Sequence, residues 1–150
     1  MKHRFVYPIV EHDAYDGDTV RVMIDRGFED YKRLSVRIKG VDTPEIRTKD
    51  KLEKEAGLAA RDFVNHWLAC LAWCGESPGV LMFDSIERDK FSGRGVGDLF
   101  PAGSPDVTLS DVLLSSHIAR PYDGGKKEPW TRQELFAILN NPTIQSLRHE

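Results

Sequence analysis

The segment VRIKGVDTPE, residues 36–45, decides how the rest of the chain can fold. Its first half alternates apolar and cationic residues with the two-residue period of a half-buried strand, and Pro44 ends that strand because proline cannot donate a ladder hydrogen bond. Asp42 and Glu45 therefore follow a strand end, with Arg37 further back on the same strand. Carboxylates bind hard divalent cations and a guanidinium binds phosphate oxygens, so the segment suits phosphate chemistry. A solvated strand face with an Asx turn at Asp42 explains it equally well, and other segments have to decide.

Four further segments have the alternation or the aromatic and β-branched content of short strands. The second strand is the clearest, because Val20, Val22 and Ile24 fall on one face. Asp16-Gly17 just before it is a strong turn signal, so the first three strands are predicted to form an antiparallel meander. The five predicted strands are residues 4–11, 19–25, 31–40, 80–87 and 96–100.

After Pro44 the apolar period changes to 3.6 residues, which predicts a long amphipathic helix. Its stripe contains Phe63 and Trp67 as expected core anchors, and the full set is Ala59, Phe63, Trp67, Leu71 and Cys74. Five short strands with a helix inserted after the third describe an α+β fold, a five-stranded OB-fold β-barrel with three helices.

Two shorter helices complete the prediction. One spans about residues 109–119, capped by Thr108 or Ser110. The other begins near Trp130, where Thr131 and Glu134 have capping-box spacing. It is predicted to stop before residues 140–142, and the last residues are expected to fray.

With 150 residues and 40% hydrophobic content, the chain is predicted to be one domain over residues 1–150, with a core at about 5–140. No apolar run approaches the roughly twenty residues of a membrane span, and no apolar region follows the basic start. We therefore expect no membrane partner, no signal peptide, a cytoplasmic location and, by default, a monomer.

Charge and cysteine content limit the choice of function. A net charge of -3 is unusual for a nucleic-acid binder, although a local basic strip can still bind a polyanion. Cys70 and Cys74 are four apart in the predicted helix and are expected to be reduced core thiols. No other cysteine and no well-spaced histidine completes a zinc set with them.

Three separated segments combine into one pattern: Asp16-Gly17-Asp18-Thr19, then Arg37 with Val41-Asp42-Thr43-Pro44-Glu45, and then Asp89-Lys90-Phe91-Ser92-Gly93-Arg94. In this order and spacing they resemble the thermonuclease (staphylococcal-nuclease-like) family. The resemblance covers about residues 5–127 and includes the stretch ARPYDGGKK, residues 119–127. It implies the five-stranded barrel with three helices and a calcium-dependent hydrolysis of DNA and RNA that leaves 3′-phosphate ends.

The resemblance also implies roles for individual residues. Asp18 and Asp42 are expected to coordinate Ca²⁺, with the main-chain carbonyl of Thr43 as a further ligand. Glu45 is expected to orient or deprotonate the attacking water. The scissile phosphate and its transition state are expected to be bound by Arg37 and Arg94.

Elementary chemistry leads to a compatible site. A phosphodiester repels hydroxide, so a nuclease has to neutralise phosphate oxygens, supply a nucleophile and stabilise the charge that develops. Calcium accepts six to eight oxygen ligands at flexible geometry, so two aspartates, a carbonyl, waters and substrate are sufficient. Two guanidinium groups then offer forked donors where charge builds up.

The basic loop at residues 119–127 adds candidates for substrate binding. Tyr122 is expected to stack on a base, and Lys126 and Lys127 to contact a flanking phosphate, although a lysine pair in a loop is often simply solvated. Asp16 is expected to form the turn rather than to bind the ion. Ser92 adds one residue to the loop that delivers Arg94, which leaves the reach of this arginine less defined.

Two other classes of function stay open. The first is a catalytically inactive OB-fold module that binds nucleic acid or protein, and the second is a calcium-binding regulatory module. The enzyme is favoured because all five of its expected polar site residues are present: Asp18, Arg37, Asp42, Glu45 and Arg94.

Overall fold

The computed structural model describes residues 5–72, 81–88 and 94–148. Its main sheet is a closed barrel with the strand order β1-β2-β3-β6-β5, and β5 pairs back onto β1. Neighbouring strands are antiparallel except β3 and β6, which run parallel. The barrel strands are β1 (Phe5–Ala14), β2 (Thr19–Asp25), β3 (Tyr31–Ile38), β5 (Leu81–Arg88) and β6 (Arg94–Pro101).

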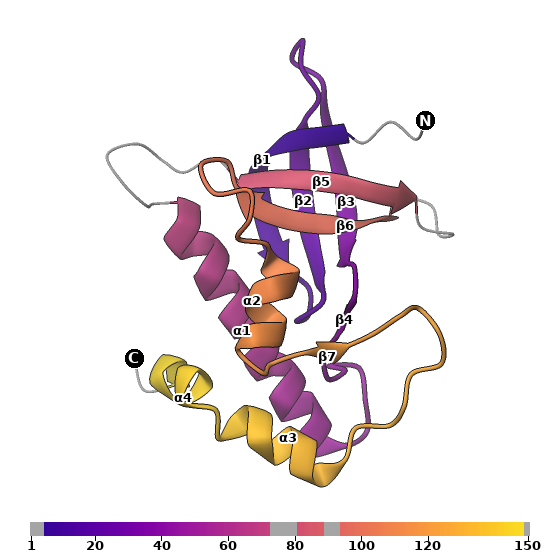
Figure 1. The fold of residues 1–150 in the computed structure, drawn as a ribbon, viewed down its shortest axis with the longest axis vertical. Coiled ribbons are helices and arrows are strands. Elements are labelled where there is room, and N and C mark those ends of the chain that lie inside the picture. The colour runs from indigo at the N-terminus through magenta and orange to yellow at the C-terminus, as the bar shows by residue number, and fades with distance from the viewer. Residues whose placement is uncertain (1–4, 73–80, 89–93, 149–150) are drawn as a thin grey trace.

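A second, two-stranded sheet lies below the barrel (Figure 1). It consists of β4 (Val41–Asp42) and β7 (Arg120–Pro121), which are antiparallel and place Asp42 opposite Arg120. Neither strand was predicted, because each is only two residues long and the partners are 78 positions apart. This sheet ties the segment after β3 to the basic loop that follows β7.

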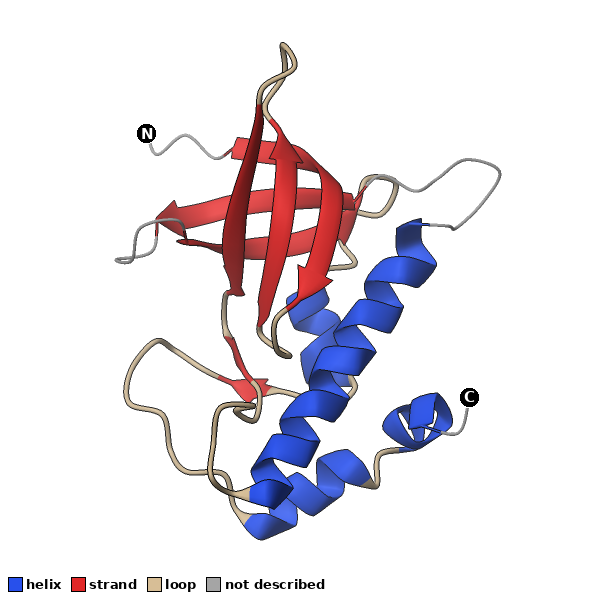
Figure 2. Ribbon diagram, turned by 180° about the vertical axis from the view of Figure 1, so that it is seen from behind, coloured by secondary structure: helices blue, strands red, loops and turns tan. Residues whose placement is uncertain are grey.

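Four helices occur in the described ranges, where the sequence predicted three; the α+β class is confirmed. They are α1 (Lys51–Ala72), α2 (Leu109–Ser115), α3 (Arg132–Leu139) and α4 (Pro142–Arg148). Helix α1 runs diagonally from the barrel down to α3, and α4 follows α3 (Figure 2). Both α3 and α4 contact α1.

Side-chain caps explain where the helices begin. Asp50 Oδ1 accepts hydrogen bonds from the main-chain nitrogens of Leu52 (2.9 Å) and Glu53 (3.3 Å) at the start of α1. Thr108 caps α2 and Thr131 caps α3. The Thr131 hydroxyl accepts from the nitrogen of Glu134 at 3.2 Å, as the capping-box spacing predicted.

The expectation that the last residues fray is wrong as far as residue 148, because α4 covers Pro142–Arg148; residues 149–150 lie outside the described residues. Asn141 Oδ1 accepts a hydrogen bond from the main-chain nitrogen of Thr143 at 2.9 Å, and Pro142 occupies the first helical position, where its missing N–H costs nothing. Ile144 of α4 is 1% exposed, so burial of an apolar side chain holds the helix in place. Helix α2 is shorter than predicted, and His117, with φ of 57°, lies just beyond it.

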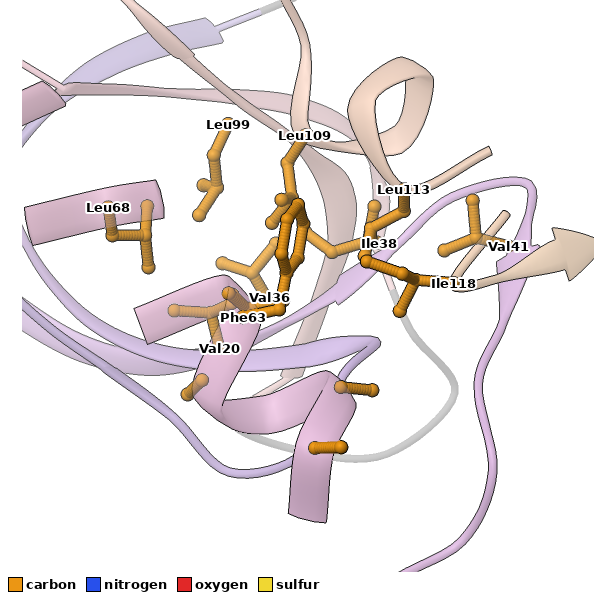
Figure 3. Packing of buried hydrophobic residues seen from close by; sticks show 14 of the residues in the cluster. Val20, Val36, Ile38, Val41, Phe63, Leu68, Leu99, Leu109, Leu113 and Ile118 are labelled. Atoms are coloured by element: carbon orange, nitrogen blue, oxygen red, sulfur yellow. The ribbon is translucent and has the colours of Figure 1, made fainter. Parts of the chain in front are cut away.

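One hydrophobic core joins the barrel to the helices (Figure 3). Phe63 of α1 lies among residues of β2, β3 and α2, which confirms it as a core anchor, and Trp67 is partly buried against the same core. Burying a large apolar side chain typically contributes about 1.5–3 kcal/mol. The core residues labelled in Figure 3 are Val20, Val36, Ile38, Val41, Phe63, Leu68, Leu99, Leu109, Leu113 and Ile118.

The prediction that the cysteines are core thiols is wrong for Cys70. This residue is exposed, and its Sγ lies 3.4 Å from Nε2 of His66, one helical turn earlier. Cys74 lies outside the described residues. Among the helices within residues 5–72, 81–88 and 94–148, none combines the length and apolar character needed to cross a membrane.

Candidate functional site

Described residues from all three segments singled out in the sequence, with Arg94 alone from the third, line one hollow of the surface. A surface hollow of about 380 Å³ is lined by residues from the turn before β2, from β3, from the start of β6 and from the loop after β7. Five of the predicted site residues line it: Asp18, Arg37, Glu45, Arg94 and Lys127. Asp42 and Thr43 lie directly alongside, because the nitrogen of Thr43 donates to Asp18 Oδ2 at 3.1 Å.

The turn before β2 is shaped by Asp16 and by close packing. Asp16 Oδ1 accepts a hydrogen bond from the nitrogen of Asp18 at 3.1 Å, which is the turn-forming role predicted for it. A side chain at Gly17 would place its Cβ 2.7 Å from Thr43 Oγ1 and 2.8 Å from Ala60 Cβ. Glycine is therefore required here because α1 and residue 43 approach the turn so closely.

Asp18 is a buried carboxylate with both oxygens engaged. It is 4% exposed; Oδ2 accepts from Thr43, and Oδ1 accepts from the Thr19 hydroxyl at 3.2 Å. Arg37 Nη1 lies 3.5 Å from Oδ2. Arg37 on β3 is thus the cation paired with Asp18.

Arg37 is tied to the main chain as well as to Asp18. Its Nη1 donates to the carbonyls of Asp18 (3.3 Å) and Ile38 (3.1 Å), and Nη2 donates to the carbonyl of Val41 at 2.9 Å. Three of its five N–H groups therefore hold the end of β3 against β4. Within the described residues the other two have no hydrogen-bond acceptor.

Asp42 is more deeply buried, at 2% exposure, and its two oxygens differ. Oδ2 accepts from Arg120 Nε at 3.1 Å and lies 3.0 Å from Nη2. Oδ1 forms an ion pair with Lys127 Nζ at 3.2 Å, but this contact lacks hydrogen-bond geometry, and Oδ1 has no hydrogen-bond partner among the described residues. The hydroxyl of Thr43 is unpartnered in the same way.

These two orphaned oxygens bear on the question of a cation. A buried polar atom without a partner costs about 1–3 kcal/mol, so such atoms mark places where a ligand completes the structure. The described residues contain no set of three or more His, Cys, Asp or Glu arranged to hold a metal by themselves. Two aspartates and a hydroxyl nevertheless offer only oxygen donors, which fits a hard cation whose remaining ligands are water and substrate.

The charges around the hollow also favour a cation. Burial, and then the negative charges of Asp18 and Glu45, raise the pKa of Asp16 to about 7. Burial disfavours the charged form of Lys127, but the charges of Asp18 and Asp42 outweigh it, and the pKa of Lys127 is raised. Beyond the effect of burial, the carboxylates of the site thus lie close enough together to raise the pKa of Asp16, and a bound cation would relieve this repulsion.

Arg120 is the site residue that the sequence analysis missed. Besides Asp42, it contacts Glu134 Oε2 (3.1 Å) and the carbonyl of Glu128, and its guanidinium lies 3.9 Å from the centre of the Trp130 ring. Its position within the family-like stretch at residues 119–127 was the available signal. The contact itself depends on the β4–β7 pairing, which two-residue strands do not reveal in advance.

The predicted substrate-binding residues of the loop after β7 make different kinds of contact. Lys127 Nζ reaches Asp42 Oδ1 and lies 3.4 Å from Glu45 Oε1, so it lies against carboxylates. Tyr122 donates its hydroxyl proton to the carbonyl of Gly125 at 2.6 Å, and its ring centre is 5.7 Å from the Arg37 guanidinium. Together with the exposed Lys126, both residues line a second hollow of about 490 Å³ next to Asp42.

Arg94 lies on a barrel strand, whereas Glu45 lies on an exposed loop. Arg94 is the first residue of β6 and pairs with Ser35 of β3, so it is a strand residue and not the loop residue predicted. Ser92, in the preceding loop, lies outside the described residues. The Glu45 side chain is 48% exposed on a loop, and its main-chain nitrogen donates to Glu53 Oε1 at 3.3 Å.

The comparisons with known proteins add no assignment. No family model matches the chain, and a search of curated proteins finds no match either.

Proposed function

We propose that this chain is a calcium-dependent nuclease that hydrolyses phosphodiester bonds of DNA or RNA, built on an OB-type barrel like that of the thermonuclease family. The observation that carries the proposal is the pair of buried aspartates, Asp18 and Asp42, whose segments are joined by the bond from Thr43 to Asp18, with an unpartnered oxygen on Asp42. The expected partner is nucleic acid, and the acting unit is the monomer.

The barrel topology supports the finer fold proposal. The first three strands form a meander, β3 pairs in parallel with the last barrel strand β6, and α1 lies between β3 and β5 in the chain. A five-stranded, Greek-key barrel with a helix after its third strand is the OB arrangement. Its open end here carries the hollow with the carboxylates and arginines.

Asp18, Asp42 and Thr43 would hold the calcium ion. When bound, the ion supplies positive charge to the phosphate oxygens and makes a coordinated water easier to deprotonate. Arg120 holds Oδ2 of Asp42, which leaves Oδ1 as the oxygen that Asp42 would offer to the ion. Oδ1 has only the Lys127 ammonium beside it, at 3.2 Å and without a hydrogen bond.

The arginines take the charge that builds on the phosphate. Arg37 offers the two N–H groups that the main chain leaves over, and Arg94 lines the same hollow from β6. Guanidinium forks match phosphate oxygens in geometry, which an ammonium group does not. Loss of one donor at developing charge typically costs about 10²–10³-fold in rate.

Glu45 is the group placed to accept the proton. As a water oxygen bonds to phosphorus, Glu45 takes the water proton, and the bond from phosphorus to the 5′-oxygen breaks. The 5′-oxygen leaves with a proton from solvent, and the phosphate stays on the 3′ side. An exposed carboxylate on a loop exchanges protons freely with solvent, which returns Glu45 to its starting state.

The direct test incubates the purified chain with plasmid DNA and with single-stranded RNA, in calcium and then in excess chelator. Cleavage is expected in calcium and is expected to stop with chelator. Glu45→Gln should lower the rate about 10²–10⁴-fold while nucleic acid still binds. Glu29→Gln, an exposed glutamate in the turn between β2 and β3, is the matched control and should cleave normally.

Other outcomes distinguish the alternatives. Cleavage that persists in chelator, or that survives Glu45→Gln unchanged, contradicts the mechanism. Tight binding of nucleic acid with no cleavage in any metal supports the inactive OB-fold module instead. Calcium binding without affinity for nucleic acid supports the regulatory module.

A further inference from the structure

Two arginines at the edge of the site have an unusual partner. The guanidinium of Arg21 lies 4.7 Å from the centre of the Tyr15 ring, and that of Arg47 lies 5.9 Å from the same centre. Both arginines are exposed, and Tyr15 is half-buried. Tyr15 and Arg21 line the hollow that also contains Asp18. One ring thus holds two positive groups beside the proposed reaction centre.

Four other arginines of the described surface are matched to acids, whereas Arg132 has only the Phe136 ring. Ion pairs of 2.7–3.1 Å join Arg26 to Asp30, Arg33 to Glu11, Arg61 to Asp62 and Arg148 to Glu55. In the part of the chain that the structure describes, Arg21 and Arg47 have only the ring contact. In a chain of net charge -3, two arginines that contact the same ring and form no ion pair in the described residues indicate a site for an anion.

The strand register gives the place of this site relative to the scissile phosphate. In the β2–β3 pair, Thr19 lies opposite Arg37 and Arg21 lies opposite Ser35, while the intervening Val20 is fully buried. Arg21 and Thr19 therefore share the outer face with Arg37. Two residues along a strand span about 7 Å, a step comparable to that between successive phosphates of an extended nucleic-acid strand.

We propose that Tyr15, Arg21 and Arg47 form a subsite for the phosphate adjacent to the one that is cleaved. The inference rests on the proposed nuclease function and specifies how its substrate lies, along β2 away from Asp18. The aromatic ring orders both guanidinium groups, which leaves their N–H groups directed to phosphate oxygens. Because the guanidinium groups lie over the ring, the subsite binds the backbone and discriminates little between bases.

The test measures binding of a fluorescent single-stranded octathymidylate to the full chain in calcium, with Glu45→Gln present throughout to prevent cleavage. Arg21→Ala and Arg47→Ala should each weaken binding about two- to fivefold near 0.15 M salt and should make the dependence of log K on log salt shallower by about 0.7. Arg132→Ala is the control, because Arg132 also lies over a ring, that of Phe136 at 5.7 Å, but on α3. It should change neither quantity.

A cleavage assay without Glu45→Gln separates this subsite from the reaction centre. Arg21→Ala should raise KM for the oligonucleotide at unchanged kcat, and should not affect bis(p-nitrophenyl) phosphate, which has a single phosphodiester. If no form cleaves but Arg21→Ala and Arg47→Ala still lose affinity, the nuclease proposal fails and the subsite stands. No binding of the oligonucleotide, or equal losses in Arg132→Ala, would overturn the subsite.

Discussion

Asp18 and Asp42 are two buried carboxylates with the same expected task and opposite surroundings. Both oxygens of Asp18 are occupied, by the Thr43 nitrogen and the Thr19 hydroxyl, and Arg37 lies 3.5 Å away. Asp42 has one oxygen held by Arg120 and one that lacks a hydrogen bond. Hydrogen bonds to both oxygens thus fix Asp18 in the barrel, whereas Asp42 is fixed through Oδ2 and lacks a hydrogen bond at Oδ1.

The difference shows that the site is assembled from two halves. The partners of Asp18 come from β2, β3 and the segment just after them, whereas Asp42 depends on β7 and the loop beyond it. The barrel half is formed by residues 18–43, early in the chain. The later half supplies Arg120 and Lys127, the two cations paired with Asp42. These cations therefore determine how much of the negative charge of Asp42 is available to a bound ion.

The largest loss of stability is expected when the ion pair between Arg120 and Asp42 is removed. Arg120→Ala leaves the Asp42 carboxylate buried beside Lys127 alone, and should lower the free energy of unfolding by about 3 kcal/mol, as for other broken buried pairs. Urea denaturation followed by tryptophan fluorescence measures it. Calcium-dependent cleavage should fall at the same time, because Asp42 is no longer held in place.

A double-mutant cycle tests whether Asp42 is the cause. Asp42→Asn removes the stranded charge, so the double variant Arg120→Ala, Asp42→Asn should be more stable than Arg120→Ala alone. The surface pair Arg26–Asp30 is the control, and Arg26→Ala should cost at most about 1 kcal/mol. Additive effects of the two site substitutions would show that the pair is not coupled.

Asp18 should behave differently, because Arg37, which loses the opposite charge, keeps three main-chain carbonyl acceptors, whereas the N–H of Thr43 loses its acceptor. Asp18→Ala leaves the N–H of Thr43, a residue 1% exposed, without its acceptor and should cost about 1–3 kcal/mol of unfolding free energy. The same denaturation series measures it. Asp62→Ala, at an exposed acid on α1, should remain within about 0.5 kcal/mol of the parent. A cost for Asp18→Ala above that of Arg120→Ala would reverse the comparison.

The same division explains how much the sequence could predict. The alternation of Val20, Val22 and Ile24 gave β2, and Thr131 with Glu134 gave the start of α3, because both signals are local. Asp18, Arg37 and Glu45 were found by residue type and spacing, and the structure brings them to one hollow.

Contacts between distant segments were the part that could not be predicted. The pairing of β4 with β7 brings Arg120 to Asp42, and strands of two residues are too short to be predicted from an alternation of apolar and polar residues. Asn141-Pro142 was taken as the end of one helix because proline stops helices, although the same pair also starts them, as it does for α4. Cys70 was predicted to be a core thiol from its residue type alone, but it lies outside the apolar stripe, on the exposed side of α1.

A smaller effect is expected when the cation next to the bare oxygen of Asp42 is removed. Lys127 Nζ stands 3.2 Å from that oxygen and has to give way to a bound ion, so Lys127→Met should tighten calcium binding about fivefold, roughly 1 kcal/mol. Titration calorimetry without nucleic acid measures it. Lys126→Met, the exposed neighbour, is the control and should bind calcium like the parent. Weaker calcium binding in Lys127→Met would show that the ammonium supports the site instead of competing with the ion.

The smallest effect concerns a third buried carboxylate, Asp98, which is fully partnered and lies outside the site. Its oxygens accept from Leu99 N (2.9 Å), Ser110 N (3.1 Å) and the Ser110 hydroxyl. Burial raises the pKa of Asp98 despite these bonds, so the folded state keeps its proton to a higher pH than the unfolded chain does. The contribution of Asp98 to stability therefore falls as pH rises from about 3.8 through the raised pKa.

Thermal melts over this pH range measure the effect: the parent should lose stability relative to Asp98→Asn as pH rises. Ser110→Ala, which removes the donating hydroxyl, should raise the pKa of Asp98 further, so the loss should continue to a higher pH. If instead the parent becomes more stable relative to Asp98→Asn as pH rises, the hydrogen bonds of Asp98 outweigh its burial.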